Sequence, residues 1–295
     1  IQFADGTFHA DITGLDWWEE WPVKDEIKEL LDLEYGRVTL VVAIPKEVQD
    51  KHDICNLDDL LDKLEHGEWK IATEYMHTTR KLICEEARNN AERKSRQIPL
   101  PTMVFPLMPQ KDESPIQIIY SIGATEAKPL VGAHVIVDCS ETGRTLRVND
   151  LKVIHKGKQS TARLFANRKH LEKKEVKEQL LALATALHGV LVEKHFFHLF
   201  ANISKYNRDK LEHSSLWKLA QQGVTIVKSG RQARIDALIA RKDYHSAIPS
   251  LWQLQATDIV VFEPQGVIWP RKHQRLWENA PYLELLRDLE RKNSE

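Results

Sequence analysis

Apolar residues along this 295-residue chain form short β-branched runs and longer periodic runs, and the two kinds predict different elements. The short runs are bounded by proline, glycine or other turn residues, which favours strands. They lie at 37–45, 102–108, 116–122, 133–139, 145–148, 151–155 and 223–230. Most of them fall between about residues 98 and 157, so we expect the central sheet there.

Apolar residues at three- and four-residue spacing predict helices over the remaining segments. Ile27, Leu30 and Leu31 predict a helix at 22–36 that begins at Pro22 and ends at Gly36. Further helices are expected at 56–67, 68–94, 231–242 and from about residue 271, and the chain is expected to be helical from 160 almost to 222. Alternation around Asp5-Gly6 predicts a hairpin at residues 3–12, and 257–269 is expected to form a last one.

These elements predict an α/β or α+β protein with a mostly antiparallel central sheet at about 98–157, covered by long helices at about 160–222. An acidic α/β region at 1–97 forms the predicted N-terminal part, and 98–295 forms the main domain. Turn-rich residues near 95–100 mark the boundary between them. No internal repeat or low-complexity linker interrupts either part.

Charge is distributed unevenly, although the formal net charge is only -1. Residues 1–70 hold 18 acidic and 7 basic side chains, whereas residues 151–245 hold 8 acidic and 19 basic ones. Either the acidic part folds against the basic segment 151–245, or that segment faces a polyanion such as a nucleic-acid backbone. The pattern alone leaves both alternatives open.

Composition excludes several classes of protein. The three cysteines are far apart and form no CxxC pair, which argues against a disulfide scaffold and favours a cytoplasmic protein. The longest apolar stretch, 180–192, is too short to cross a membrane, and the first residues carry no secretion signal. Because the chain begins with isoleucine, we expect it to be part of a longer protein. The glycine-rich motifs of dinucleotide-binding and P-loop proteins are absent.

The segment HVIVDCSETGRTLRV, residues 134–148, carries the most suggestive chemistry. An apolar strand ends at Asp138, and a tight turn at Thr142-Gly143 follows it. A carboxylate at a rigid strand end is a common ligand for Mg²⁺. This order of strand, aspartate, turn and strand resembles the start of RNase H-like folds. The alternative is an ordinary aspartate that caps a turn.

A second pattern resembles the D…ExK arrangement of restriction-type nucleases. It consists of Asp112, Glu126 and Lys128, where two carboxylates would bind the metal and the lysine would activate water. The chain contains seven ExK triplets, and only the one at Glu126 follows an expected strand. Asp138 and Glu126 are therefore the predicted metal ligands, with Mg²⁺ as the cofactor if the protein is a nuclease.

The sequence names no reaction, and three functions compete. The leading hypothesis is a nucleic-acid-associated subunit of a larger DNA- or RNA-processing assembly, such as a defence complex, with other protein subunits as partners and no membrane. Its predicted phosphate contacts are Lys156, Lys158, Arg163, Arg168, Lys169, Lys173, Arg231 and Arg234. The first alternative is a Mg²⁺-dependent nuclease that uses Asp138 with Glu126 or Asp112. The second is a non-catalytic protein-interaction subunit with an acidic N-terminal face.

Overall fold

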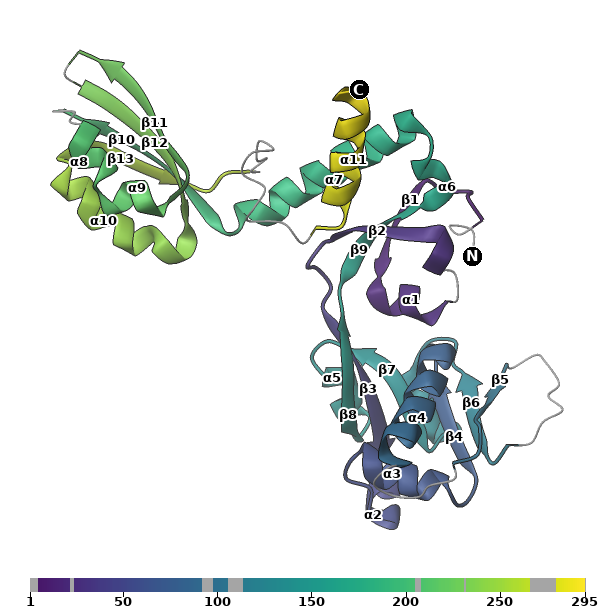
Figure 1. Ribbon diagram of the computed structural model, residues 1–295. Coiled ribbons are helices and arrows are strands. Elements are labelled where there is room, and N and C mark those ends of the chain that lie inside the picture. The colour runs from purple at the N-terminus through teal and green to yellow at the C-terminus, as the bar shows by residue number, and fades with distance from the viewer. Residues whose placement is uncertain are drawn as a thin grey trace. The chain divides into compact units, whose positions relative to one another are not determined.

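The chain folds into two compact units, which are described separately (Figure 1). One contains residues 1–28 and 34–168, and the other contains residues 29–33 and 169–295. The computed structural model describes residues 5–21, 24–91, 98–105, 114–204, 208–230, 232–265 and 280–294. The predicted boundary at 97/98 falls inside the first unit.

A six-stranded mixed sheet forms the centre of the first unit. Its strand order is β5 (Thr102–Val104), β6 (Ile116–Tyr120), β4 (Trp69–Thr73), β7 (Val135–Ser140), β3 (Val38–Pro45) and β8 (Leu151–Ser160). The four strands from β5 to β7 run parallel, and β3 is antiparallel to both β7 and β8. The mixed α/β class is therefore confirmed, but the sheet is not mostly antiparallel and draws two strands from residues before 98.

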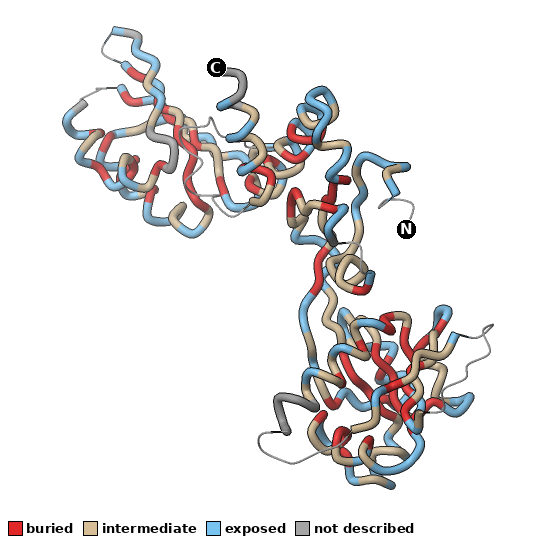
Figure 2. The backbone as a smooth tube through the Cα atoms, turned by 45° about the vertical axis from the view of Figure 1, so that its right-hand side comes forward, coloured by how far each residue is buried: buried red, intermediate tan, exposed pale blue. Residues whose placement is uncertain are grey.

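Alternate residues of the central strands point to opposite faces of the sheet. Both faces are apolar here, and helices cover both of them. Val42 and Val137 pack against α3 (Leu57–Leu64) and α4 (Met76–Ala91). Val41 and Ile136 pack with Leu146 of the short helix α5 (Arg144–Val148). Figure 2 shows the resulting buried residues along the strands. The strand predicted at 145–148 is wrong, because these residues belong to α5, which buries Leu146 against the sheet.

Parallel strands place their carboxyl ends at one edge of the sheet, and here three loops leave from that edge. Glu74 and Tyr75 follow β4, and Ser121 to Gly123 follow β6 on the way to the 3₁₀ helix η2 (Thr125–Val131). The turn after Ser140 leads from β7 into α5. This edge is called the carboxyl edge below.

The first unit also contains a strand pair, β1 (Ala10–Gly14) with β9 (Ala162–Asn167), which run antiparallel. Helix α1 (Leu15–Glu20) follows β1 directly. Of the hairpin predicted at 3–12, residues 3 and 4 lie outside the described residues, and the described β1 pairs with β9, about 150 residues later. Another small helix of this unit is α2 (Lys46–His52).

The segment predicted as a helix at 22–36 contains the 3₁₀ helix η1 (Lys24–Glu26) and the strand β2 (Ile27–Asp32). Ile27, Leu30 and Leu31 are all buried, with exposed fractions of 6%, 0% and 3%. Burial on both faces of a strand removes the alternation that identifies strands in a sequence. The same residues therefore imitated the spacing of a helix.

The second unit contains a four-stranded antiparallel sheet. Along the chain, its first strand is followed by two helices, two strands, a helix and the last strand. The sheet order is β11 (Ala220–Ser229), β12 (Gln232–Ala240), β10 (Phe196–Ile203) and β13 (Ala256–Phe262). Helices α8 (Arg208–Glu212), α9 (Ser215–Leu219) and α10 (Tyr244–Gln253) bury one face of it, and η3 (Arg241–Asp243) precedes α10. The helix predicted at 231–242 is β12.

Two helices complete the second unit, α7 (Lys174–Glu193) and α11 (Tyr282–Ser294). They meet where His188 Nδ1 lies 2.9 Å from the hydroxyl of Tyr282. The predicted helical block at 160–222 is therefore only partly right, because β9, α6 (Arg168–Leu171), α7, β10 and the start of β11 divide it. Among the described residues, no helix is long and apolar enough to cross a membrane.

Candidate functional site

Three carboxylates gather at the carboxyl edge of the first unit. Asp138 of β7 is surrounded by Glu74 and Glu126, and Glu74 Oε1 accepts a hydrogen bond of 2.8 Å from the Gly123 N–H. Burial, together with the charges of Glu74 and Glu126, raises the pKa of Asp138 to about 6, against the lowering effect of the hydrogen bond from the Cys139 N–H. Asp138 thus exchanges its proton close to neutral pH.

The turn after β7 presents polar groups at the same edge. Ser140 Oγ accepts a hydrogen bond of 3.0 Å from the Gly143 N–H, and Gly143 has a left-handed φ of 68°. Arg147 donates to the Thr142 carbonyl at 3.1 Å and closes the turn. Thr142, Arg144 and Thr145 are left exposed. Hydroxyl groups, a guanidinium and backbone N–H groups of this kind suit an oxyanion such as a phosphate.

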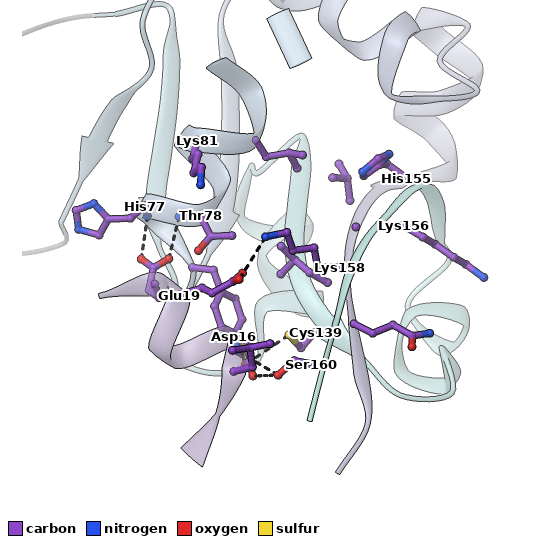
Figure 3. Close-up of a pocket in the computed structure, with 18 of the residues that line it drawn as sticks. Asp16, Glu19, His77, Thr78, Lys81, Cys139, His155, Lys156, Lys158 and Ser160 are labelled. Atoms are coloured by element: carbon purple, nitrogen blue, oxygen red, sulfur yellow. Dashed lines mark hydrogen bonds and ion pairs between the residues drawn. The ribbon is translucent and has the colours of Figure 1, made fainter. Parts of the chain in front are cut away.

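A pocket of about 620 Å³ lies on the other face of β7, between α1, α4, β3 and β8 (Figure 3). Its apolar lining comes from Leu15, Leu40, Val42 and Leu82, with Tyr75 beside them. Its volume is within the range of pockets that enclose a small organic ligand. The pocket and the carboxyl edge share β7, whose Asp138 points to one face and whose Cys139 points to the other.

Asp16 of α1 forms a hydrogen-bonded hub at one side of this pocket. Its carboxylate accepts from the Tyr75 hydroxyl at 2.7 Å, from the Ser160 hydroxyl, and from Cys139 Sγ at 3.6 Å (Figure 3). The N–H of Asp16 also donates to Ser160 Oγ at 3.0 Å. One carboxylate therefore connects α1 to the ends of β4, β7 and β8.

Glu20, one helical turn after Asp16, attaches α1 to α4. It is only 4% exposed, and its two carboxylate oxygens accept from the backbone N–H groups of His77 and Thr78 at 2.8 and 2.9 Å. An anionic cap at a helix N-terminus satisfies donors that have no partner within the helix. The start of α4 is thereby fixed at the wall of the pocket.

Charged side chains line the mouth of the pocket. Lys158 Nζ lies 3.2 Å from Glu19 Oε1 (Figure 3). On α4, Lys81 Nζ lies 3.6 Å from Glu85 Oε1. Lys156, His77 and His155 add further basic groups, and Glu20, Glu85 and Glu86 also line the pocket, so its charged lining is mixed. The apolar interior suits a planar ring, and the lysines offer positive charge to phosphate groups.

The structure brings together only part of the predicted nuclease site. Asp138 and Glu126 interact, and Lys128 lies in η2 with Glu126. Asp112 lies outside the described residues. Within the described part of the chain, no group of three or more histidine, cysteine, aspartate or glutamate side chains has the arrangement of a metal site. The assignment of Asp138 and Glu126 as metal ligands stays a prediction.

The predicted phosphate contacts do not belong to one structural element. Lys156 and Lys158 lie on β8, and Arg163 lies on β9; Arg168 and Lys169 are in α6, and Lys173 precedes α7. Arg234 of β12 packs its guanidinium 4.4 Å above the ring of Phe200. Arg231 lies outside the described residues. Of this set, only Lys156 and Lys158 line the pocket.

Sequence reasoning missed Asp16, Tyr75 and Ser160. Tyr75 and Ser160 follow Asp16 by 59 and 144 residues, so no short spacing along the chain connects the three. The one signal in the sequence was the position of Tyr75 just after an apolar strand, which is similar to the position of Asp138 near the end of another. That signal becomes useful only when the parallel order of β4 and β7 is known.

Comparison with known proteins places the site in a family. Residues 1–189 match the family model described as HisG: ATP phosphoribosyltransferase. An ATP phosphoribosyltransferase of Methanocaldococcus jannaschii is 29% identical over 269 residues, which cover 90% of this chain and 80% of that protein. One of Methanosarcina mazei is 32% identical over 200 residues, or 68% of this chain and 55% of that protein.

A solved structure, the ATP phosphoribosyl transferase (HisG:HisZ) complex from Thermotoga maritima, is also similar. Its identity is 20%, its TM-score is 0.42, and the match covers 63% of this chain and 72% of that chain. The family match overturns the leading nucleic-acid hypothesis and the nuclease alternative. The basic segment was misread because its charges are distributed over several elements of both units, and only Lys156 and Lys158 of the predicted contacts line the pocket.

Proposed function

Because this chain belongs to the HisG family of ATP phosphoribosyltransferases, we propose that it transfers a phosphoribosyl group to ATP. The observation that carries the proposal is the span of the family match. Residues 1–189 include both the carboxyl edge and the pocket, so the matched region contains a complete candidate site. The reaction needs places for two substrates, and the first unit offers two adjacent ones.

The turn after β7 is the proposed site for the phosphate of the phosphoribosyl donor. Ser140 and Gly143 fix its conformation, while Thr142, Arg144 and Thr145 remain available to the ligand. An arginine and hydroxyl groups bind phosphate oxygens through charge-assisted hydrogen bonds. This position follows the general rule that ligands of α/β sheets bind beyond the carboxyl ends of the parallel strands.

The pocket is the proposed site for ATP. Leu40, Val42 and Leu82 would contact the base, and Lys156 and Lys158 lie where phosphate groups would leave the pocket. Burial of a flat ring against apolar side chains supplies affinity, and the lysines supply charge. Glu19 holds Lys158 at the rim until a phosphate replaces it.

The carboxylates beside the turn suit the chemical step. Breaking the bond at the anomeric carbon of a ribosyl donor builds positive charge on the sugar ring, as in glycoside hydrolysis. Asp138 and Glu126 supply negative charge close to the turn that would hold the phosphate. Fixed charges that meet a developing charge lower the barrier without reorganisation. Their proposed role is therefore to stabilise the transition state.

The test is an assay of the purified chain with ATP, phosphoribosyl diphosphate and Mg²⁺, in which phosphoribosyl-ATP is identified by mass. We expect product only when both substrates are present. Arg144→Ala should lower kcat/KM for the donor by about 100-fold, since a charged hydrogen-bonding group is lost. Lys218→Ala removes an exposed positive charge from α9 in the other unit and serves as the control. Absence of product from a folded chain would contradict the proposal.

A further inference from the structure

We propose that Asp16 is a positioning residue that fixes α1 as the wall of the ATP pocket, through hydrogen bonds to Tyr75, Ser160 and Cys139. The inference rests on the proposed function, because it assigns a role at the pocket that receives ATP. It concerns the shape of that pocket and places no reacting atom on Asp16.

The donors around Asp16 keep their protons. Burial raises the pKa of the Tyr75 hydroxyl well above its usual value, and burial raises the pKa of the Cys139 thiol to about 12. Both groups are therefore neutral at physiological pH and donate to the carboxylate. Three neutral donors therefore surround one acceptor in this hub.

Helix geometry gives α1 two anchoring carboxylates and a third, Glu19, that pairs with Lys158, all on the same side. Asp16, Glu19 and Glu20 are three and four positions apart, so their side chains lie on neighbouring parts of one face. Asp16 binds the strand ends, and Glu20 binds the start of α4. Glu19, between the two anchors in sequence, then meets Lys158 across the pocket mouth.

The location of the hub argues for a role beyond stability. Asp16, Tyr75, Cys139 and Ser160 are themselves part of the pocket lining. Tyr75 and Ser160 are buried and Asp16 and Cys139 are half-buried, so these polar groups cost desolvation, and apolar packing would stabilise α1 with less penalty. A directional hub instead holds α1 at a fixed distance from β8, and that distance sets the width of the pocket.

Asp16→Asn is the decisive variant, because it keeps the size of the side chain and removes one acceptor. An amide nitrogen cannot accept from the Tyr75 hydroxyl or the Cys139 thiol. We expect KM for ATP to rise about tenfold or more, the loss typical of a hydrogen bond to a charged group, while kcat changes less than about threefold. KM for phosphoribosyl diphosphate should be nearly unchanged.

Labelling of Cys139 by a maleimide, followed by mass spectrometry of the peptides, reports the hub without any turnover. The rate at Cys139 should rise about fivefold or more in Asp16→Asn, because the thiol loses its acceptor and the wall loosens. A short cysteine-containing peptide added to each reaction serves as the reference, because the exposed Cys55 lies beside Asp59, the residue changed in the control variant. If the wild-type chain does not turn over ATP, the proposed function fails, and the labelling comparison still tests the anchoring.

The matched control is Asp59→Asn in α3. Asp59 Oδ2 accepts from the backbone N–H groups of Cys55 and Asn56 at 2.8 and 3.2 Å, and it is absent from the pocket lining. This variant should lower the melting temperature and leave KM for ATP and the Cys139 labelling rate unchanged. A folded Asp16→Asn protein with wild-type KM for ATP and wild-type labelling of Cys139 would overturn the proposal. Equal effects in the two variants would do the same.

Discussion

The hydroxyl of Tyr75 donates a hydrogen bond of 2.7 Å to the carboxylate of Asp16, although 59 residues separate them in the chain. Tyr75 follows β4 of the central sheet, and Asp16 lies in the first turn of α1. This contact and the neighbouring one to Ser160 give the pocket a defined wall. Loss of either contact should therefore loosen this wall.

Tyr75→Phe removes the hydroxyl and keeps the ring, whose centroid lies 5.1 Å from that of the Trp17 ring. We expect the free energy of unfolding to fall by about 1–2 kcal/mol, because a charged acceptor loses one of its donors. KM for ATP should rise, but less than in Asp16→Asn, since Ser160 still binds the carboxylate. Urea denaturation and steady-state kinetics on the same preparation check both parts. An unchanged KM together with lower stability would restrict Tyr75 to a structural role.

Glu20→Ala should uncap α4 and destabilise the protein by about 1–2 kcal/mol, as expected for the loss of a helix cap. The comparison is Glu85→Ala on the same helix, which removes only an exposed pair with Lys81. That variant should cost at most about 0.5 kcal/mol. Thermal melts of the two proteins measure the difference. Similar melting temperatures would show that the buried cap contributes little.

Asp138→Asn should separate stability from activity. The folded chain holds the pKa of Asp138 near 6, above the value of an unfolded aspartate, so the wild-type protein binds this proton more tightly when folded. Its stability therefore declines as the pH rises from about 4 to about 6. Asparagine carries no such penalty, so at pH 7.5 the variant should be more stable by about 1 kcal/mol, after allowance for partial exposure.

The same variant should lose about 100-fold or more in kcat, because a charge near the reacting sugar is removed. Chemical denaturation at pH 5 and 7.5, combined with the product assay, tests both statements. A stability difference that does not grow between the two pH values would contradict the pKa. Full activity would remove Asp138 from the chemical step.

Gly143→Ala tests the turn after β7. A Cβ at this position meets a left-handed φ of 68° and a guanidinium nitrogen of Arg147 at 3.3 Å, whereas a Cβ at Gly132 meets a φ of 100° and open space. Both substitutions should cost about 1 kcal/mol of backbone strain. Only Gly143→Ala should raise KM for phosphoribosyl diphosphate. Equal KM values in the two variants would exclude the turn as the phosphate site.

Sequence patterns predicted the central strands of the first unit well. The runs at 37–45, 116–122 and 133–139 correspond to β3, β6 and β7, because β-branched residues between turn residues leave few other options. The segments at 27–32 and 232–240 were assigned to helices and are strands. In β12, Ala233, Ile235 and Ala237 do alternate, but the consecutive apolar residues after them obscure the period.

The site was predictable only where it is local in sequence. Asp138 and the turn at Thr142-Gly143 stand next to each other, so the sequence indicated them and placed Glu126 as a partner. The hub joins Asp16 to residues 59 to 144 positions away, and Lys158 lies 139 positions from Glu19. Folding, not spacing, creates such contacts. The basic segment was visible as charge, but charge alone does not distinguish a nucleotide from a nucleic acid.

Photocrosslinking with 8-azido-ATP, followed by peptide mapping, tests the central claim most directly, because it asks where the nucleotide binds without depending on turnover. We predict crosslinks in peptides that line the pocket of the first unit, at residues 75–86, 139 and 155–160, with loss of labelling when unmodified ATP is added in excess. Labelling that ATP does not compete away, or that falls only on the second unit, would contradict the account.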